Sequence, residues 1–207
     1  MVFKDRRAAG KLLAQKLLEY RAKDAVILAL PRGGVIPAYE IAKALGLPLD
    51  IIAARKIGHP NSSEYAIGAV DENGTILMNK QEAAAVDARW LNEETKRQKE
   101  EAMRRARVYR DGRKPVELAG KVVIIVDDGI ATGLTMRLAV MVAQMKRPKK
   151  IIVAVPVAPP EAVAELERMG AEVILLERPE EFLGAVGSHY LEFAQVNDVE
   201  VIRLLKS

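Results

Sequence analysis

Short, unbroken aliphatic runs recur along this chain, and each is followed by turn residues and then by a segment of helical periodicity. The first run, AVILAL at residues 25–30, leads through Pro31 and two glycines into a helical segment at about 36–45. Uniformly apolar strands that alternate with helices indicate a parallel sheet covered on both faces. Further strands are predicted at 49–54, 122–126, 151–155 and 172–176, and further helices at 4–21, 132–145 and 161–169. The pattern predicts an α/β fold.

One stretch between the second and third strands departs from this alternation. Residues 66–70 and 75–78 flank Asp-Glu-Asn-Gly at 71–74, whose Asn-Gly end favours the positive φ angles of a hairpin turn. Residues 81–110 contain no Gly or Pro and are rich in Glu, Lys, Arg and Ala, so they predict one long charged helix. Because its charges are mixed in sign, we expect this helix to lie across the domain or on a second subunit.

Composition excludes several kinds of site. The 207 residues include no cysteine and two histidines, His59 and His189, which argues against disulfides, thiolate metal sites and a histidine-rich metal centre. The net charge of +4 is too small to imply nucleic-acid binding but favours small anionic ligands. No apolar run approaches the roughly 18 residues of a membrane span and no secretory signal precedes the first helix, so we expect a cytoplasmic protein without membrane contacts.

The segment VVIIVDDGIATGLT at residues 122–135 carries the most chemical information. Its aliphatic run ends in two adjacent carboxylates, Asp127 and Asp128, at the end of a strand where parallel sheets bind ligands, so these acids are expected to accept hydrogen bonds from sugar hydroxyls. Backbone N–H groups at the start of the next helix are suited to a phosphate. The residues that present them are Ala131, Thr132, Gly133, Leu134 and Thr135.

Each of these features alone is typical of a turn or a helix cap, but together they predict a sugar-phosphate site. Consecutive strand residues point to opposite sides, so we expect at most one carboxylate on the buried face and a donor, a metal ion or water beside the other. The loop lacks the Gly-Lys-Ser/Thr ending of a P-loop, so the sequence does not support nucleoside triphosphate hydrolysis.

This segment resembles the phosphoribosyl-diphosphate (PRPP) binding motif of the type I phosphoribosyltransferases, in which four or five hydrophobic residues precede two acids and a Thr-Gly-x-Thr loop. The resemblance covers residues 25–56 and 121–176, and the sequences around it are similar to a poorly characterised prokaryotic branch of the family. It implies one phosphoribosyltransferase-like domain over residues 1–207, with an insertion at about 58–118 and a small C-terminal hood at about 178–207.

The activity implied by the resemblance is transfer of the 5-phosphoribosyl group from PRPP to a nitrogenous acceptor, such as a nucleobase, with release of pyrophosphate and with Mg²⁺ as cofactor. A homo-oligomer, in particular a dimer, is also expected. By the same resemblance, the turn after the first strand binds the diphosphate through Arg32, Gly33 and Gly34. The implied catalytic residues are Asp127, Asp128, Arg55 and Lys56, and the two aspartates are also the candidate Mg²⁺ ligands.

Three further segments bear on the substrates. Residues 58–64 have the composition of the mobile loop that closes over the reactants in this family. The hypoxanthine-guanine branch has an aspartate directly before Thr-Gly, where this chain has Ala131, so the usual handling of a 6-oxopurine is not implied. The scarce aromatic residues Phe182, Tyr190 and Phe193 lie in the C-terminal tail, where they either stack on the acceptor or pack the tail onto the domain.

Two other hypotheses retain the PRPP site. One is a PRPP-binding regulator that contacts nucleic acid through the basic residues between 104 and 113, and the other is a phosphoribosyl-binding subunit without turnover. Mixed charges along the long helix argue against the regulator, because nucleic-acid binding needs a clustered basic face.

Overall fold

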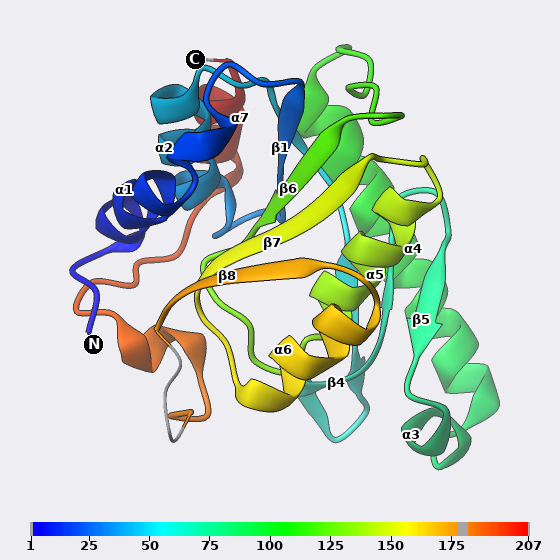
Figure 1. Ribbon diagram of the computed structural model, residues 1–207. Coiled ribbons are helices and arrows are strands. Elements are labelled where there is room, and N and C mark those ends of the chain that lie inside the picture. Colours follow the sequence, from blue (N-terminus) through cyan, green and yellow to red (C-terminus); the bar gives the residue numbers. More distant parts are fainter. Residues whose placement is uncertain (1, 178–181, 207) are drawn as a thin grey trace.

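The computed structural model describes residues 2–177 and 182–206, and for residues 63 and 64 only the backbone. Its main sheet has five strands in the order β2-β1-β6-β7-β8, all of them parallel (Figure 1). The strands are β1 (Ala25–Ala29), β2 (Leu49–Ile51), β6 (Val122–Val126), β7 (Lys150–Val157) and β8 (Glu172–Glu177). Every residue of β1 is buried, as its uniformly apolar sequence predicts. The α/β fold with a parallel sheet is thus confirmed.

Helices cover both faces of this sheet (Figure 1). One face carries α1 (Arg6–Lys16), α2 (Val35–Leu45) and α7 (Asp198–Lys206), and the other carries α5 (Leu134–Gln144) and α6 (Pro160–Arg168). Alternate strand residues serve the two cores: Ile124 packs under the first group of helices and Ile125 under the second. Asp5 caps α1 by accepting the backbone N–H of Ala8, and η1 (Leu18–Tyr20) follows it, so the predicted helix at 4–21 is two shorter elements.

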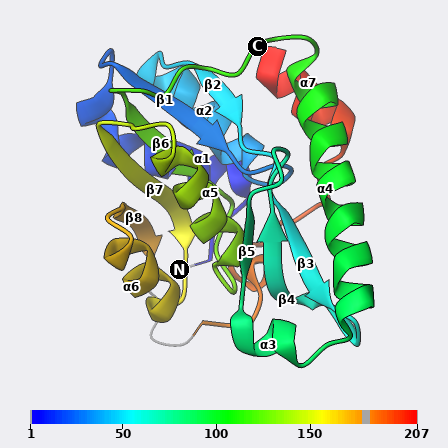
Figure 2. The ribbon, with the colours of Figure 1, turned by 90° about the vertical axis from the view of Figure 1, so that its right-hand side faces the viewer.

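A second sheet stands beside the carboxyl edge of the first (Figure 2). Its antiparallel strands β3 (Arg55–His59), β4 (Ser62–Val70) and β5 (Ile76–Met78) lie between α5 and α4 (Ala88–Arg110). The hairpin predicted around residues 71–74 is confirmed: Val70 pairs with Ile76, and the Asp71 carboxylate accepts the backbone N–H of Thr75 at 2.6 Å.

Two predictions for this region are wrong. Residues 58–64 are the tip of a β-hairpin and not a long irregular loop: they complete β3, turn at Pro60 and Asn61 and begin β4, and the fully buried Ile57 and Ile67 under α4 hold the two strands together. The single helix predicted over 81–110 is divided into α3 (Lys80–Ala84) and α4. The division occurs at Asp87, whose carboxylate accepts the backbone N–H of Trp90 at 2.8 Å and so begins the second helix.

The C-terminal tail (residues 182–197) returns along the N-terminal segment (Figure 1). Phe3 donates its N–H to the carbonyl of His189, in η2 (Val186–His189), and accepts the N–H of Leu191, both at 2.8 Å. Residues 178–181 of the predicted hood lie outside the described residues. Residues 198–206 of the predicted hood form α7, which leaves the tail and buries Val201 and Leu204 in the main core.

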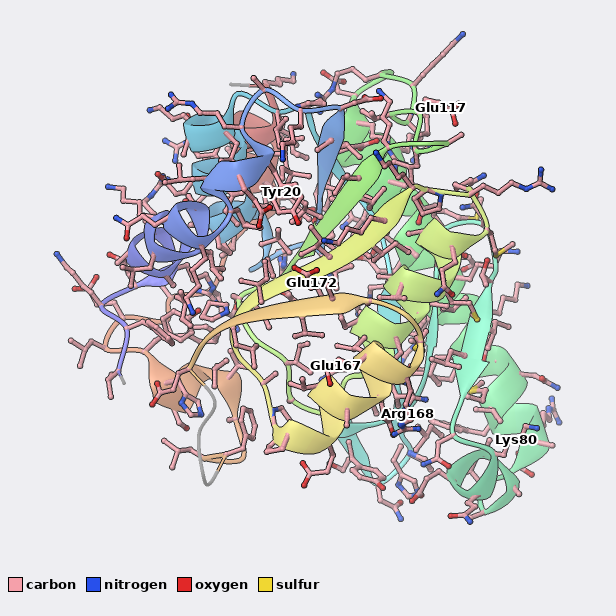
Figure 3. The ribbon with its side chains drawn as sticks, viewed as in Figure 1. Tyr20, Lys80, Glu117, Glu167, Arg168 and Glu172 are labelled. Carbon is pink, nitrogen blue, oxygen red and sulfur yellow. The ribbon has the colours of Figure 1, made fainter. Side chains whose placement is uncertain are left out.

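Polar contacts join neighbouring segments at the amino-terminal edge of the sheet, far from the C-terminal tail. Lys150, at the start of β7, donates to the hydroxyl of Tyr20 at 2.9 Å and pairs with Glu172 at 2.7 Å; Figure 3 labels Tyr20 and Glu172. No helix in the described ranges combines the length and the apolarity needed to cross a bilayer. The chemistry-bearing residues lie at the opposite, carboxyl edge.

Candidate functional site

The two aspartates lie at the centre of the carboxyl edge, directly after β6. The neighbouring strand β1 ends in the β1–α2 turn (residues 31–34), in which the Pro31–Arg32 peptide bond is cis. A Cβ atom on Gly33 would overlap Oδ2 of Asp128, and one on Gly34 would lie 2.8 Å from Oδ1 of Asp127. Glycine is therefore required at both positions by the close approach of the turn to the acids.

The carboxyl groups of Asp127 and Asp128 do not point to opposite sides, as alternation along a strand would require. The strand ends at Val126, and both side chains lie beside the β1–α2 turn. The predicted partner for one of them is present, since Nε of Arg6 donates to Oδ2 of Asp128 at 2.6 Å. Oδ1 of Asp127 accepts the backbone N–H of Asp128 at 2.8 Å.

Burial dominates the electrostatics of this pair. Loss of hydration raises the pKa of Asp127 well above its ordinary value, and the neighbouring charge of Asp128 raises it further. Burial also raises the pKa of Asp128, but the guanidinium of Arg6 opposes this shift. Asp127 is consequently the carboxyl that more readily holds a proton when no cation is nearby.

A cavity of about 210 Å³ adjoins Asp127 and extends over the β6–α5 loop (residues 129–133). Gly133 has a φ of 79°, which glycine adopts without strain, and α5 begins directly after it. The predicted phosphate-binding residues that line this cavity are Ala131, Thr132, Gly133 and Thr135, and Lys56 from β3 joins them. Leu134 lines a second, larger cavity beside the first and is largely buried. Only its backbone N–H is therefore available to a ligand at the loop.

Three arginine side chains lie near one another, on the β1–α2 turn, on β3 and on α4. Nε of Arg55 donates to Oε1 of Gln98 at 3.0 Å, and Arg32 lies 3.7 Å from Asp198. Burial lowers the pKa of Arg55, and the nearby positive charges of Arg105 and Arg32 lower it further. Arg32, Arg55 and Arg105 thus form one arginine cluster, which is suited to a multiply charged anion.

Two of the residues at this edge were not predicted as site residues. Arg6 belongs to a helix whose sequence shows only amphipathic spacing, and no local pattern connects it with Asp128, 122 positions away. Arg105 lies in the charged helix α4, where its basic neighbours indicate a solvated surface; in the structure it is 8% exposed. Only the docking of α4 on β3 could have identified it.

The aromatic residues of the C-terminal tail are brought close to the acids. The hydroxyl of Tyr190 donates to the backbone carbonyl of Asp128 at 2.6 Å, and the ring of Phe193 lies 3.6 Å beneath the guanidinium of Arg6. Phe182 stacks on His189 and lines a larger cavity of about 800 Å³ together with Ala131 and Thr132. Phe182 is thus the tail aromatic that faces open space beside the β6–α5 loop.

The residues present also fit a Mg²⁺ ion that is held mainly by a substrate. Asp127 and Asp128 offer the hard oxygen ligands that Mg²⁺ prefers, and Mg²⁺ keeps much of its hydration shell. In the part of the chain that the structure describes, no group of three or more His, Asp or Glu side chains could hold a metal ion by itself. Water and the oxygens of a bound anion would complete the coordination of a Mg²⁺ ion held by these two carboxyls.

Comparison with known proteins identifies the family. A sequence model described as the phosphoribosyl transferase domain matches residues 4–187, which includes the β1–α2 turn, both aspartates and the β6–α5 loop. The chain belongs to the phosphoribosyl transferase domain family. The resemblance noted in the sequence is thereby confirmed.

Individual members of the phosphoribosyl transferase family agree with this. The Mycobacterium tuberculosis protein Rv0571c, provisionally named a phosphoribosyl transferase, is 41% identical over 206 residues, which are 99% of this chain and 46% of that protein. The chain therefore spans about half the length of this curated relative. The crystal structure of TT1426 from Thermus thermophilus is 42% identical, covers 99% of this chain and 98% of its own, and superposes with a TM-score of 0.81.

A more distant solved structure bears on the fold alone. A hypothetical protein from Neisseria gonorrhoeae, crystallised with bound ppGpp, is 17% identical with a TM-score of 0.50 over 100% of this chain and 97% of its own.

Proposed function

We propose that this phosphoribosyl transferase domain is a Mg²⁺-dependent enzyme that moves the 5-phosphoribosyl group of PRPP to a nitrogenous acceptor and releases pyrophosphate. The observation that supports this most directly is that three features meet at one edge of the sheet: the cavity over the β6–α5 loop, the carboxyls of Asp127 and Asp128, and the arginine cluster. These three parts correspond in order to the 5-phosphate, the ribose hydroxyls and the diphosphate of PRPP.

In the proposed reaction, a nitrogen lone pair of the acceptor forms a bond to C1 of the ribose while the bond from C1 to the diphosphate oxygen breaks. The β6–α5 loop and Thr135 hold the 5-phosphate, and Asp127 and Asp128 accept hydrogen bonds from the ribose hydroxyls. Arg32, Arg55 and Lys56 stabilise the negative charge that collects on the departing diphosphate. Asp127 and Asp128 are the residues that would hold Mg²⁺, which would supply positive charge to neutralise part of the charge on the diphosphate.

We place the acceptor of this reaction on the side of C1 opposite the diphosphate. A nucleophile that displaces the diphosphate approaches C1 from the side away from the leaving group. We assign this side to the cavity of about 800 Å³, which is lined by Phe182 of the C-terminal tail and by Ala131. Tyr190 and Phe193 are occupied by Asp128 and Arg6, so we assign stacking on the acceptor to Phe182 and a supporting role to the other two.

The nucleic-acid-binding alternative receives no support from the long helix α4. Arg104 pairs with Glu101 and Asp198, Arg105 pairs with Glu101, and Arg110 pairs with Asp50 and Glu72. These three arginines are engaged by internal partners, which leaves less of the clustered basic face that such binding needs. The transferase is therefore the function we favour.

The test is a pyrophosphate-release screen of nucleobases, orotate and small amines with PRPP and Mg²⁺, with and without a chelator. We expect release with at least one acceptor, and a loss of orders of magnitude in an Asp127→Asn, Asp128→Asn double variant. The exposed Asp111→Asn variant is the matched control. Wild-type rates in the double variant would refute the proposal, and tight PRPP binding without release from any acceptor would support the silent binding subunit instead.

A further inference from the structure

Arg6, in the first turn of α1, joins three segments that are far apart in the sequence. Its Nε donates to Oδ2 of Asp128 at 2.6 Å, and its Nη1 donates to the backbone carbonyl of Ala194 at 2.7 Å. The guanidinium carbon lies 3.6 Å above the ring of Phe193. The side chains of Arg6 and Asp128 are only 10% and 14% exposed, so solvent screens this contact weakly.

The C-terminal tail touches the same point of the chain in two further ways. The hydroxyl of Tyr190 donates to the backbone carbonyl of Asp128 at 2.6 Å. At Gly129, a Cβ atom would lie 2.5 Å from a methyl carbon of Val186, so the tail is packed directly onto the residue after the acid. Residues 186–194 therefore cover Asp128 and Gly129, and Arg6 fastens this cover to the carboxylate.

The contact is better suited to orientation than to stability. A buried ion pair contributes little net stability, because the cost of removing both charges from water offsets much of their attraction. A planar guanidinium, however, can donate in two directions and stack at once, which fixes the direction of the carboxylate it binds. Gly33 of the β1–α2 turn leaves room for this arrangement, since its Cβ would also come within 3.2 Å of Nε of Arg6.

We propose that Arg6 is a positioning residue for the sugar donor: it orients Asp128 beside the β1–α2 turn and makes the donor site depend on docking of the C-terminal tail. This inference rests on the proposed function, because the donor is taken to be PRPP. The tail then serves both substrates, with Phe182 facing the acceptor and Phe193 and Ala194 holding the residue that orients Asp128.

Calorimetric titration of PRPP with Mg²⁺ into the full chain tests this directly, since it needs no acceptor. We expect Arg6→Gln to weaken PRPP binding by about tenfold to a hundredfold, the range that corresponds to losing a hydrogen bond to a charged group. Arg6→Lys should recover only part of the loss, because an ammonium cannot reach Asp128 and Ala194 together and stack on Phe193. The matched control is Arg7→Gln on the same helix, whose side chain is 41% exposed and pairs with Glu40.

A second variant separates positioning from folding. Phe193→Leu leaves the Arg6 and Asp128 side chains in place but removes the stacking, and we expect several-fold weaker PRPP binding with little change in the unfolding temperature. PRPP binding by folded Arg6→Gln and Phe193→Leu proteins that equals the wild type would overturn the inference, as would an equal loss in Arg7→Gln. If the wild type itself fails to bind PRPP, the proposed function is refuted; wild-type binding with unaffected variants refutes only the role of Arg6.

Discussion

At the scale of single residues, the site depends on how closely its parts approach one another. The two glycines of the β1–α2 turn were assigned from the sequence to expose backbone amides, and the structure adds a steric requirement. Gly33 and Gly34 have no φ in the left-handed region; what excludes a side chain is the Asp128 carboxyl at Gly33, and the carbonyl oxygen of Leu30 together with Asp127 at Gly34. In the arginine cluster, by contrast, side chains of like charge lie close together, at a place where an anionic ligand would balance their charge.

Replacement of Gly33 by alanine tests the steric requirement. The added methyl group would displace Asp128 and Arg6, and forcing an extra carbon into such a contact costs about 1–3 kcal/mol. We expect Gly33→Ala to weaken PRPP binding in calorimetry by more than it lowers the free energy of unfolding in urea. Unchanged PRPP affinity in a folded Gly33→Ala protein would contradict this account of the turn.

Replacement of Arg55 by glutamine should separate stability from activity. Removing one charge relieves the repulsion from Arg105 and Arg32, so the melting temperature should stay the same or rise. Pyrophosphate release should fall by about 10²–10³-fold, as it does when one preorganised donor is removed elsewhere. The control is Arg97→Gln, because Arg97 is a largely exposed arginine of α4. Equal activity in the two variants would argue against a role for Arg55.

At the scale of elements, α4 and the second sheet form one unit that carries Arg55, Lys56 and Arg105 to the edge of the main sheet. The unit has its own small core, in which Trp90 and Leu91 cover Ile57 and Ile67. Its sequence predicted the hairpin because Asn-Gly is a local turn signal, but it did not reveal β3, which pairs through non-local contacts with β4. Asp87 is a helix-capping residue and so marks the start of α4, but it was not distinguished from the charged residues around it.

Loss of the α4 cap provides a test of this unit. Asp87→Ala removes the carboxylate that accepts the N–H of Trp90, and loss of such a cap costs about 0.5–2 kcal/mol. We expect urea unfolding to shift by that amount while PRPP binding by the folded protein is unchanged, since Asp87 is far along the chain from any site residue. Glu93→Ala, on the exposed face of α4, should show a smaller effect.

The pH dependence of stability should report the internal charges of α4. Hydrogen bonds from Arg104, and then from Arg105, lower the pKa of Glu101 from 4.5 to about 2. A lowered carboxyl pKa adds stability that is fully present above the unfolded value of 4.5 and is lost as the pH falls toward 2. The difference in unfolding free energy between wild type and Glu101→Gln should therefore shrink over this range. A constant difference from about pH 6 to about pH 2 would show that the pairing is not electrostatic.

At the scale of the whole molecule, the site is held by contacts between distant parts of the chain. Asp198, at the start of α7, accepts from the hydroxyl of Tyr109 at 2.7 Å and from Arg104 at 3.0 Å, and lies 3.7 Å from Arg32. One carboxylate thereby connects the C-terminal helix, the long helix of the insertion and the β1–α2 turn. These partners, the Tyr109 hydroxyl first, lower the pKa of Asp198.

Asp198→Asn should loosen all three connections at once. Asparagine keeps one acceptor oxygen but places an NH2 group against the second donor, so it cannot accept from both Tyr109 and Arg104. A buried donor left without its acceptor costs about 1–3 kcal/mol, so we expect a decrease of that size in the urea-derived free energy of unfolding. PRPP binding should also weaken, because Arg32 loses a neighbour that restrains it. The control is Asp111→Asn, since Asp111 is an exposed acid paired with Lys206, and exposed pairs contribute little to stability. Equal losses of stability and of PRPP affinity in Asp198→Asn and Asp111→Asn would refute the role of Asp198 in connecting these three segments.

The sequence by itself determined the parallel α/β sheet and the loop that follows β6. Uniformly apolar strands, the Asn-Gly turn and the Asp-Asp-Gly-Ile-Ala-Thr-Gly-Leu-Thr segment are local patterns, so periodicity and turn chemistry were sufficient to recognise them. They also placed Asp127 and Asp128 at the carboxyl edge, because a parallel sheet leaves few other positions for polar residues at a strand end.

Only the tertiary structure decided which residues surround those acids. Arg6 and Tyr190 reach Asp128 from a first helix and a C-terminal tail, and no residue spacing relates them to it; Arg105 reaches Arg55 from an inserted helix in the same way. A short sequence window records local backbone preference and burial, whereas a contact across 122 positions depends on how whole elements pack. The two acids could therefore be predicted from the sequence, whereas the side chains that orient them could not.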